Sequence, residues 1–151
     1  MAVSGNMMTV SINYGSGVWT YKLVESGSTL DWVGTWRLSP EAGALHVGPG
    51  DGSTWWENSL DDVTTRACLF DDDYVFNADG SFNNVLGEET WIEGWQGGSD
   101  ACGAPVYPHD GSNAATYTFD AGAGTVTLNG VGAYLGPVSY THLTLPTILL
   151  V

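Results

Sequence analysis

The sequence predicts an all-β domain: an antiparallel meander of about eight short strands that closes into a barrel or a sandwich. Apolar and polar residues alternate over short stretches, as they do in strands with one buried face. Turn residues, including 21 glycines, separate these stretches. Val, Thr and aromatic residues, which favour strands, are common, and nothing in the pattern indicates alternating strands and helices.

The first element is a hairpin over residues 7–25, turning at "GSG". A lone hairpin is marginal in water, so we expect it to pair with the next strand, residues 32–39, and to help close the barrel. In that arrangement Trp19 and Trp36 would lie near one another. The side chains expected on the buried face of the hairpin are Met8, Val10, Ile12, Tyr14, Trp19, Tyr21 and Leu23.

Two long excursions interrupt the alternation. Residues 39–62 carry Pro, Gly and Asp without a sustained period and predict a long loop that includes one short helical turn. Residues 97–113 predict a second long loop. Between them, residues 74–85 predict a hairpin around the tight turn "NADGS", and residues 89–96 predict another strand. A final hairpin, residues 114–136, should point Tyr117, Phe119, Val126 and Leu128 inward.

The charge is strongly acidic, with 17 Asp and Glu against 3 Lys and Arg, for a net charge of −14. Such a surface repels nucleic acid and anionic membranes, so we expect neither as a partner. It suits neutral ligands or cations. The first ten residues lack the basic and apolar regions of a signal peptide, so we expect the chain to be cut from a longer protein.

The two cysteines, Cys68 and Cys102, fit one disulfide in a secreted protein or two buried thiols in a cytosolic one. There is no CxxC pair or Cys/His cluster of the kind that binds zinc.

The tail, residues 137–151, is uncharged and ends in "ILLV". Its stretch "VSYTHLTLPT" resembles the translated read-through of a transposase-type sequencing adapter. We therefore expect a non-native tail on a metagenomic fragment, with no part in any site. Its apolar residues could still pair with an open sheet edge; they are Val138, Tyr140, Leu143 and Leu145.

Three stretches carry a family resemblance: "LDWVGTWRLSPEAGAL", "TRACLFDDDYVFNADGSF" and "TWIEGWQG". They resemble lipocalin-like modules of large secreted proteins of marine bacteria, which occur in tandem and often accompany glycan-degrading enzymes. The "GTWRL" strand is Gly34–Leu38, and the resemblance covers residues 31–136. It implies a lipocalin-like barrel, a secreted or cell-surface location, neighbouring modules and a disulfide between Cys68 and Cys102.

The same resemblance leaves the limits of the domain open. Residues 1–30 are either this domain's first hairpin or the end of a preceding repeat. The family's usual C-terminal strands are absent, so the barrel is either incomplete or circularly permuted. In such barrels the tryptophan of "GTW", here Trp36, is structural.

Aromatic side chains beside carboxylates predict a non-catalytic carbohydrate-binding or enzyme-tethering module. The expected ligand-binding residues are Trp55, Trp56 and Glu57 in the first excursion, Trp91, Glu93 and Trp95 on one face of a strand, and Tyr107 in the second loop. Three alternatives stay open. In the first, one tryptophan of the first excursion plugs the barrel and the face that carries Trp91 belongs to the core. In the second, the barrel interior binds a small apolar ligand. In the third, the chain is a ligand-free structural spacer.

We expect no catalytic residues and no cofactor. Glu93 with Glu89, Asp100 or Asp110 could imitate a glycosidase pair, but 17 carboxylates make chance pairs easy. Calcium is a weak alternative at residues 71–73 or 77–81, where turn chemistry already explains the Asp-Gly pair. His109 beside Asp110 is read as part of a solvated loop.

Overall fold

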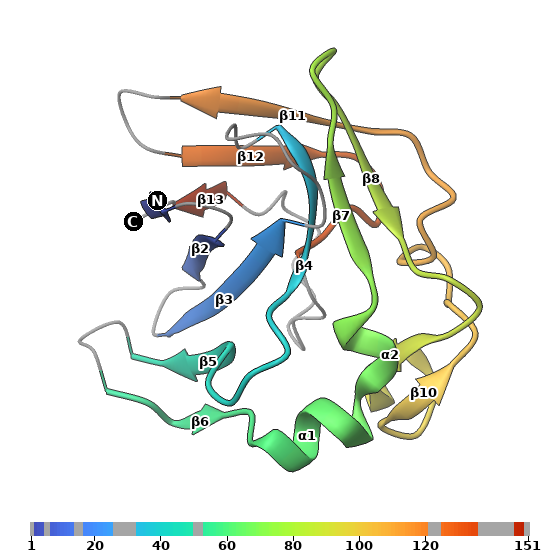
Figure 1. Cartoon of the computed structure of the whole chain (residues 1–151). Coiled ribbons are helices and arrows are strands. Elements are labelled where there is room, and N and C mark those ends of the chain that lie inside the picture. Colours follow the sequence, from blue (N-terminus) through green and yellow to red (C-terminus); the bar gives the residue numbers. More distant parts are fainter. Residues whose placement is uncertain are drawn as a thin grey trace.

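The computed structural model describes residues 2–4, 7–13, 17–25, 33–49, 53–120, 125–135 and 147–149. Antiparallel strands dominate, and the main sheet curls round on itself, with two short helices at one end (Figure 1). The predicted all-β, barrel-like fold is therefore confirmed.

Eight of the described strands form a ring. In chain order they are β2 (Met7–Asn13), β3 (Val18–Glu25), β4 (Gly34–Leu38), β7 (Asp73–Phe76), β8 (Ser81–Val85), β11 (Ala115–Asp120), β12 (Thr125–Asn129) and β13 (Thr147–Leu149). Each pairs antiparallel with the next, and β13 pairs with β2. The order is that of an up-and-down meander, in which the first and last strands of a closed barrel are neighbours.

The β2–β3 hairpin is an integral part of this ring. Its register runs from Met7 opposite Val24 to Asn13 opposite Val18. The predicted inward side chains are buried or half-buried, except that Tyr14 lies outside the described residues. As predicted, β3 pairs with β4, and the first half of β3 pairs with β5 (Leu45–Gly48).

The expected proximity of Trp19 and Trp36 is wrong. Trp36 lies opposite Glu25, and Trp19 lies opposite Ile12 and Val47. Six residues of β3 separate these two levels, which is about 20 Å along a strand. Sequence alternation shows which face a residue occupies, but it does not fix how far one strand is shifted along its neighbour.

Both excursions contain more structure than predicted. The first holds β5 and β6 (Trp56–Glu57), which were not predicted, and the start of α1 (Leu60–Thr65), where one short helical turn was expected; α2 (Ala67–Phe70) follows. The second region holds β9 (Thr90–Ile92), the 3₁₀ helix η1 (Gly94–Gln96) and β10 (Ala101–Gly103), which pairs with β9. A short strand, β1 (Ala2–Ser4), pairs with β2.

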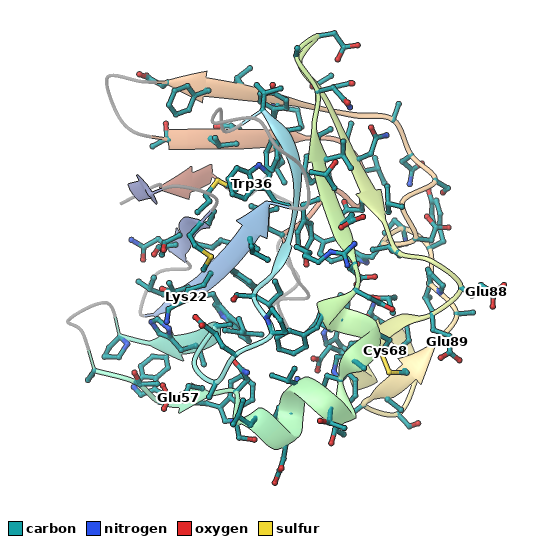
Figure 2. All side chains as sticks on the ribbon, in the orientation of Figure 1. Lys22, Trp36, Glu57, Cys68, Glu88 and Glu89 are labelled. Atoms are coloured by element: carbon teal, nitrogen blue, oxygen red, sulfur yellow. A yellow bond between two sulfur atoms is a disulfide. The ribbon has the colours of Figure 1, made fainter. Side chains whose placement is uncertain are left out.

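The core fills the inside of the ring. Trp36 has no exposed surface and points between the strands (Figure 2), so its predicted structural role is confirmed. Phe76 makes edge contacts with Phe82 and Tyr117, at ring-centroid distances of 5.0 and 5.2 Å. Phe119, predicted to point inward, is instead exposed, although Tyr117 on the same strand is buried.

The Cys68–Cys102 disulfide is present, with Cα atoms 5.9 Å apart. It joins α2 to β10 and so ties the second excursion to the first. No helix among the described residues is long and apolar enough to cross a membrane.

The tail does pair with the sheet, as its apolar composition suggested. The pairing residues are Thr147–Leu149, between β12 and β2, whereas residues 138–145 lie outside the described part of the chain. Strand β13 thereby fills the position in the ring between β12 and β2. Its non-native origin stays a prediction.

Candidate functional site

The two excursions meet at one end of the ring, which we call the capped end. It is covered by α1, α2, β9, η1 and β10 (Figure 1). Four of the seven predicted ligand-binding residues lie in β6, β9 or η1, Glu93 lies between β9 and η1, and Trp55 directly precedes β6. Tyr107 follows in the loop after β10.

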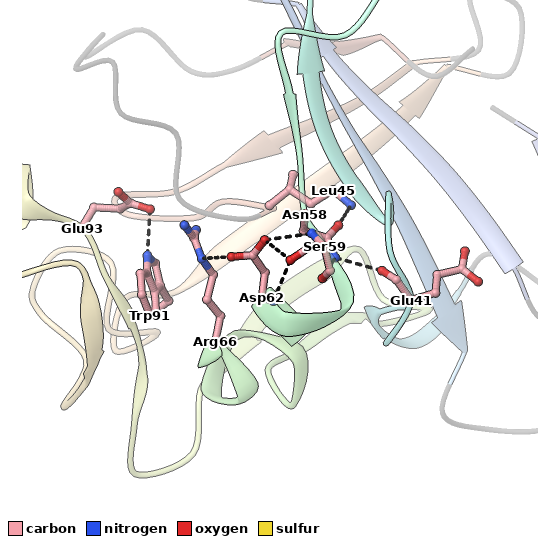
Figure 3. Close-up of polar contacts among 8 residues, drawn as sticks. All are labelled: Glu41, Leu45, Asn58, Ser59, Asp62, Arg66, Trp91 and Glu93. Atoms are coloured by element: carbon pink, nitrogen blue, oxygen red, sulfur yellow. Dashed lines mark hydrogen bonds and ion pairs between the residues drawn. The ribbon is translucent and has the colours of Figure 1, made fainter. Parts of the chain in front are cut away.

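Helix α1 begins at a cap that the sequence "NSLDD" encodes. Ser59 N–H donates to Asp62 Oδ2 at 2.8 Å, and Asp62 N–H donates to Ser59 Oγ at 3.1 Å, which makes a reciprocal capping box. These hydrogen bonds hold the pKa of Asp62 below its usual value. The preceding residue, Asn58, is buried and accepts from Leu45 N–H at 2.8 Å, so α1 is fixed against β5 (Figure 3).

Arg66 lies between two tryptophan rings. Its guanidinium carbon is 4.4 Å from the Trp91 ring centroid and 5.2 Å from that of Trp56, and its Nε is 3.8 Å from Asp62 Oδ1 (Figure 3). This geometry is a double cation–π contact. Trp91 is buried, as in the core alternative for that position, and Arg66 occupies ring faces that a sugar would need.

The predicted single face of Trp91, Glu93 and Trp95 does not exist. Strand β9 ends at Ile92, Glu93 caps η1, and Gln96 Oε1 accepts from Glu93 N–H at 2.9 Å. The chain therefore leaves the two-residue period of a strand. Trp91 points inward and donates from Nε1 to Glu93 Oε1 at 3.0 Å, whereas Trp95 is 39% exposed.

An aromatic row runs from the surface toward the interior. The Trp95 ring meets the His109 ring edge-on at 5.3 Å, and His109 meets Tyr134 at 5.7 Å. Asn84 fixes Tyr134 by accepting from its N–H at 3.3 Å and donating to its carbonyl at 2.8 Å. Burial lowers the pKa of His109 in spite of neighbouring Asp110, so the imidazole is neutral at neutral pH.

Carboxylates flank this row. Asp100 Oδ1 accepts from Gly94 N–H at 2.8 Å, directly beside Trp95. Asp110 Oδ1 accepts from Ser112 Oγ at 2.6 Å and from its N–H at 3.1 Å, and these bonds lower the Asp110 pKa. Tyr107, 66% exposed, lies in the same loop as His109. We call Trp95, Tyr107, His109, Asp100 and Asp110 the rim surface.

A polar cluster beneath the rim surface was not predicted. Asp72 is fully buried, and Thr90 Oγ1 donates to its Oδ2 at 2.6 Å. Tyr134 lies close enough to Asp72 to feel its charge, and Tyr74 lies within electrostatic reach of Tyr134, Asp72 and Tyr21. Burial raises the pKa of Asp72 to about 8, against the opposing Thr90 hydrogen bond, and it also raises the pKa of all three tyrosines.

Two oxygens of this cluster are unsatisfied. Among the described residues, the Tyr21 hydroxyl and Asp72 Oδ1 are buried and have no hydrogen-bond partner. A sequence signal existed, because Asp72 precedes Tyr74 and Phe76 at the same two-residue spacing and so shares their inward face. Asp73, one residue later, points the other way and binds Arg37 Nη2 at 2.8 Å.

The remaining predicted positions are spread out. Trp55 is 57% exposed, Trp56 is half-buried against Arg66, and Glu57 is exposed on β6. The aspartates at 71–73 diverge, and no group of three or more His, Cys, Asp or Glu side chains gathers within the described ranges. Asp79 accepts from Ser81 N–H at 2.9 Å, as its predicted turn requires.

Comparisons of the chain with protein-family models, curated proteins and solved structures found no match. The fold and the site define the class of protein as an acidic, disulfide-linked antiparallel barrel with an aromatic rim surface at one end. Its function is inferred from that surface.

Proposed function

We propose that the chain is a non-catalytic, secreted module that binds a neutral glycan at the rim surface and so tethers a neighbouring module to it. The observation that carries this proposal is the partly exposed Trp95 ring, with Asp100 bound to the adjacent Gly94 N–H and Asp110 next to His109, which Trp95 contacts. An aromatic face packs against the apolar face of a sugar, and carboxylates accept hydrogen bonds from its hydroxyls.

The charge distribution supports a neutral glycan. All three basic side chains already pair with acids: Lys22 with Glu41 at 3.4 Å, Arg37 with Asp73 at 2.8 Å and Arg66 with Asp62 at 3.8 Å. An anionic polysaccharide would therefore meet a surface of like charge. The disulfide is compatible with an oxidising, extracellular compartment.

The hydrogen bonding of the rim carboxylates supports binding over hydrolysis. A glycosidase acid needs a carboxyl with a raised pKa at the scissile bond. The pKa of Asp110 is instead lowered, because its carboxylate accepts hydrogen bonds from the side chain and the N–H of Ser112. The carboxyl whose pKa is raised, Asp72, is buried beneath the surface.

The test is binding of the purified chain to laminarin, a neutral β-glucan, with alginate as the anionic comparison, by affinity electrophoresis and calorimetry. Trp95→Ala and Tyr107→Ala should each weaken laminarin binding at least about tenfold, because losing one stacked ring costs more than ~1.4 kcal/mol. Phe119→Ala is the matched control, since it removes an exposed ring from β11. Unchanged binding by Trp95→Ala, or a preference for alginate, would overturn the proposal.

Trp55 provides a further arm of this experiment. It is exposed beside the Trp56–Arg66–Trp91 stack, which links β6 to β9 by direct contacts. If the ligand is an extended chain, Trp55→Ala should weaken binding of long laminarin fragments but not of a disaccharide. Equal effects on both lengths would place Trp55 outside the glycan site.

A further inference from the structure

From the ring contacts at the rim surface, we infer that His109 is a positioning residue: its imidazole holds the Trp95 ring in the orientation that a ligand meets. This inference rests on the proposed glycan site and gives His109 a role other than contact with the sugar. The two rings meet edge to face, with centroids 5.3 Å apart and an interplanar angle of 90°. Trp95 is exposed and His109 is half-buried, so the histidine supports the tryptophan from the protein side.

Trp95 needs such support because its own element is short. It lies in η1, a three-residue 3₁₀ helix that begins at Gly94 and is followed by Gly97, which has a left-handed φ of 88°. Glycines leave the backbone many conformations, and Asp100 Oδ1 restricts them by accepting from Gly94 N–H at 2.8 Å. That hydrogen bond fixes the backbone, whereas the contact with His109 restricts the side-chain torsions of Trp95. A ring that is ordered before binding loses less entropy when a ligand stacks on it.

The backbone of His109 is itself fixed by close packing. Its N–H donates to the Val106 carbonyl at 2.9 Å, within one turn. Gly132, with a φ of 76°, approaches so closely that a Cβ there would collide with the Pro108 carbonyl. Gly111, with a φ of 72°, lies against strand β8 in the same way, and a Cβ there would collide with a β8 carbonyl. The loop that carries His109 is therefore held between β8 and the segment after β12.

The imidazole is held by rings on both sides. Besides Trp95, it contacts the Tyr134 ring at 5.7 Å, and Asn84 fixes the Tyr134 backbone by accepting at 3.3 Å and donating at 2.8 Å. The row from Asn84 to Trp95 thus links the wall of the barrel to the surface that a ligand would touch. A phenyl ring at position 109 could make the same ring contacts, whereas a methyl group could not.

The charge state of His109 should influence ligand binding through this contact. Burial lowers the pKa of the imidazole in spite of neighbouring Asp110. A ligand that covers Trp95 removes further water from His109, so ligand binding and protonation of His109 oppose each other. Affinity should therefore fall as the pH drops through the titration of His109. The other titratable groups on the packed elements are Glu93 and Asp100 beside η1, Tyr107 and Asp110 in the same loop, and Tyr134 with Asp72 behind it.

Fluorine NMR of the full chain labelled with 5-fluorotryptophan tests the inference without a ligand. The Trp95 signal is the one that Trp95→Phe removes. His109→Ala should move this signal toward the shift of a solvated ring and weaken laminarin binding by about two- to tenfold, the range expected for one ring contact. His109→Phe should restore both. His46→Ala, which removes another half-buried histidine from β5, is the matched control and should change neither.

The pH profile gives a second readout, from about pH 8 to pH 5. The parent should lose laminarin affinity toward acid more steeply than His109→Phe, because the neighbouring carboxyls titrate in both proteins and cancel. An unchanged Trp95 signal in His109→Ala, or laminarin affinity equal to that of the parent, would overturn the inference. If Trp95→Ala binds laminarin as the parent does, the proposed glycan site fails instead, and the fluorine signal still decides whether His109 holds the ring.

Discussion

Replacing Asp72 with Asn should remove a large pH dependence from the stability of this protein. In the folded chain burial raises the Asp72 pKa to about 8, whereas an unfolded aspartate keeps a value near 3.8. Between these values the folded state holds a proton that the unfolded state has released. The free energy of unfolding must therefore fall as the pH rises through this window.

The size of the effect follows from the separation of the two pKa values. Each pH unit within the window changes the free energy of unfolding by about 1.4 kcal/mol, so a window of roughly four units amounts to ~6 kcal/mol at most. The contribution is fully present below about pH 4 and fully lost above about pH 8. The amide side chain of the Asp72→Asn variant cannot ionise, so the variant should match the parent near pH 4 and exceed its stability increasingly toward pH 8.

Urea unfolding followed by tryptophan fluorescence, at pH values from about 5 to 8.5, measures this difference. The pKa of His109 is lowered by burial and those of Asp62 and Asp110 by hydrogen bonds, but these groups titrate in both proteins and cancel. Glu88→Gln provides the control for loss of one exposed charge. A difference between variant and parent that stays constant with pH would refute the assignment of Asp72 as a buried, protonated carboxyl.

Two further predictions concern the framework that carries the site. Reducing the Cys68–Cys102 disulfide, or replacing both cysteines with Ala, should lower the free energy of unfolding by about 3–4 kcal/mol, because the bond closes a loop with a sequence separation of 34. Equal denaturant midpoints with and without reductant would contradict this prediction. Deleting residues 1–25 should unfold the chain, because it removes two adjacent ring strands and buried side chains worth ~1.5–3 kcal/mol each; a cooperative melt at an unchanged midpoint would show that the barrel closes without the hairpin.

The strands were predictable because local alternation and local turns determine them. The β7–β8 hairpin follows from Tyr74 and Phe76 at a two-residue spacing and from the "NADGS" turn, in which Gly80 takes a left-handed φ of 84°. Prediction from alternation failed where a side chain, rather than a neighbouring strand, accepts the backbone hydrogen bond. Gln96 caps the Glu93 backbone, the strand ends, and Trp95 turns away from the face of Trp91.

The buried cluster was harder to predict because its members come from separate elements. Tyr21 lies in β3 and Thr90 in β9, whereas Asp72 and Tyr134 lie in connections, so packing between elements distant in the sequence forms the cluster. The inward position of Asp72 could be read from its spacing to Tyr74. The sequence does not show that Asp72 Oδ1 has no hydrogen-bond partner among the described residues. Whether a buried polar atom is hydrogen-bonded depends on packing between elements that are distant in the sequence.

The location of the rim surface follows from the order of the connections. In an up-and-down meander consecutive connections alternate between the two ends of the barrel. Here the long connections all fall at the same end of the barrel, and the "NADGS" turn falls at the other end. The long connections are residues 39–72 between β4 and β7, residues 86–114 between β8 and β11, and the segment after β12. Arg66, Trp91 with His109, and Tyr134 lie on these three connections and meet there. In such a barrel, the end that receives the long connections is therefore the end where a site can form, and the sequence shows which connections are long.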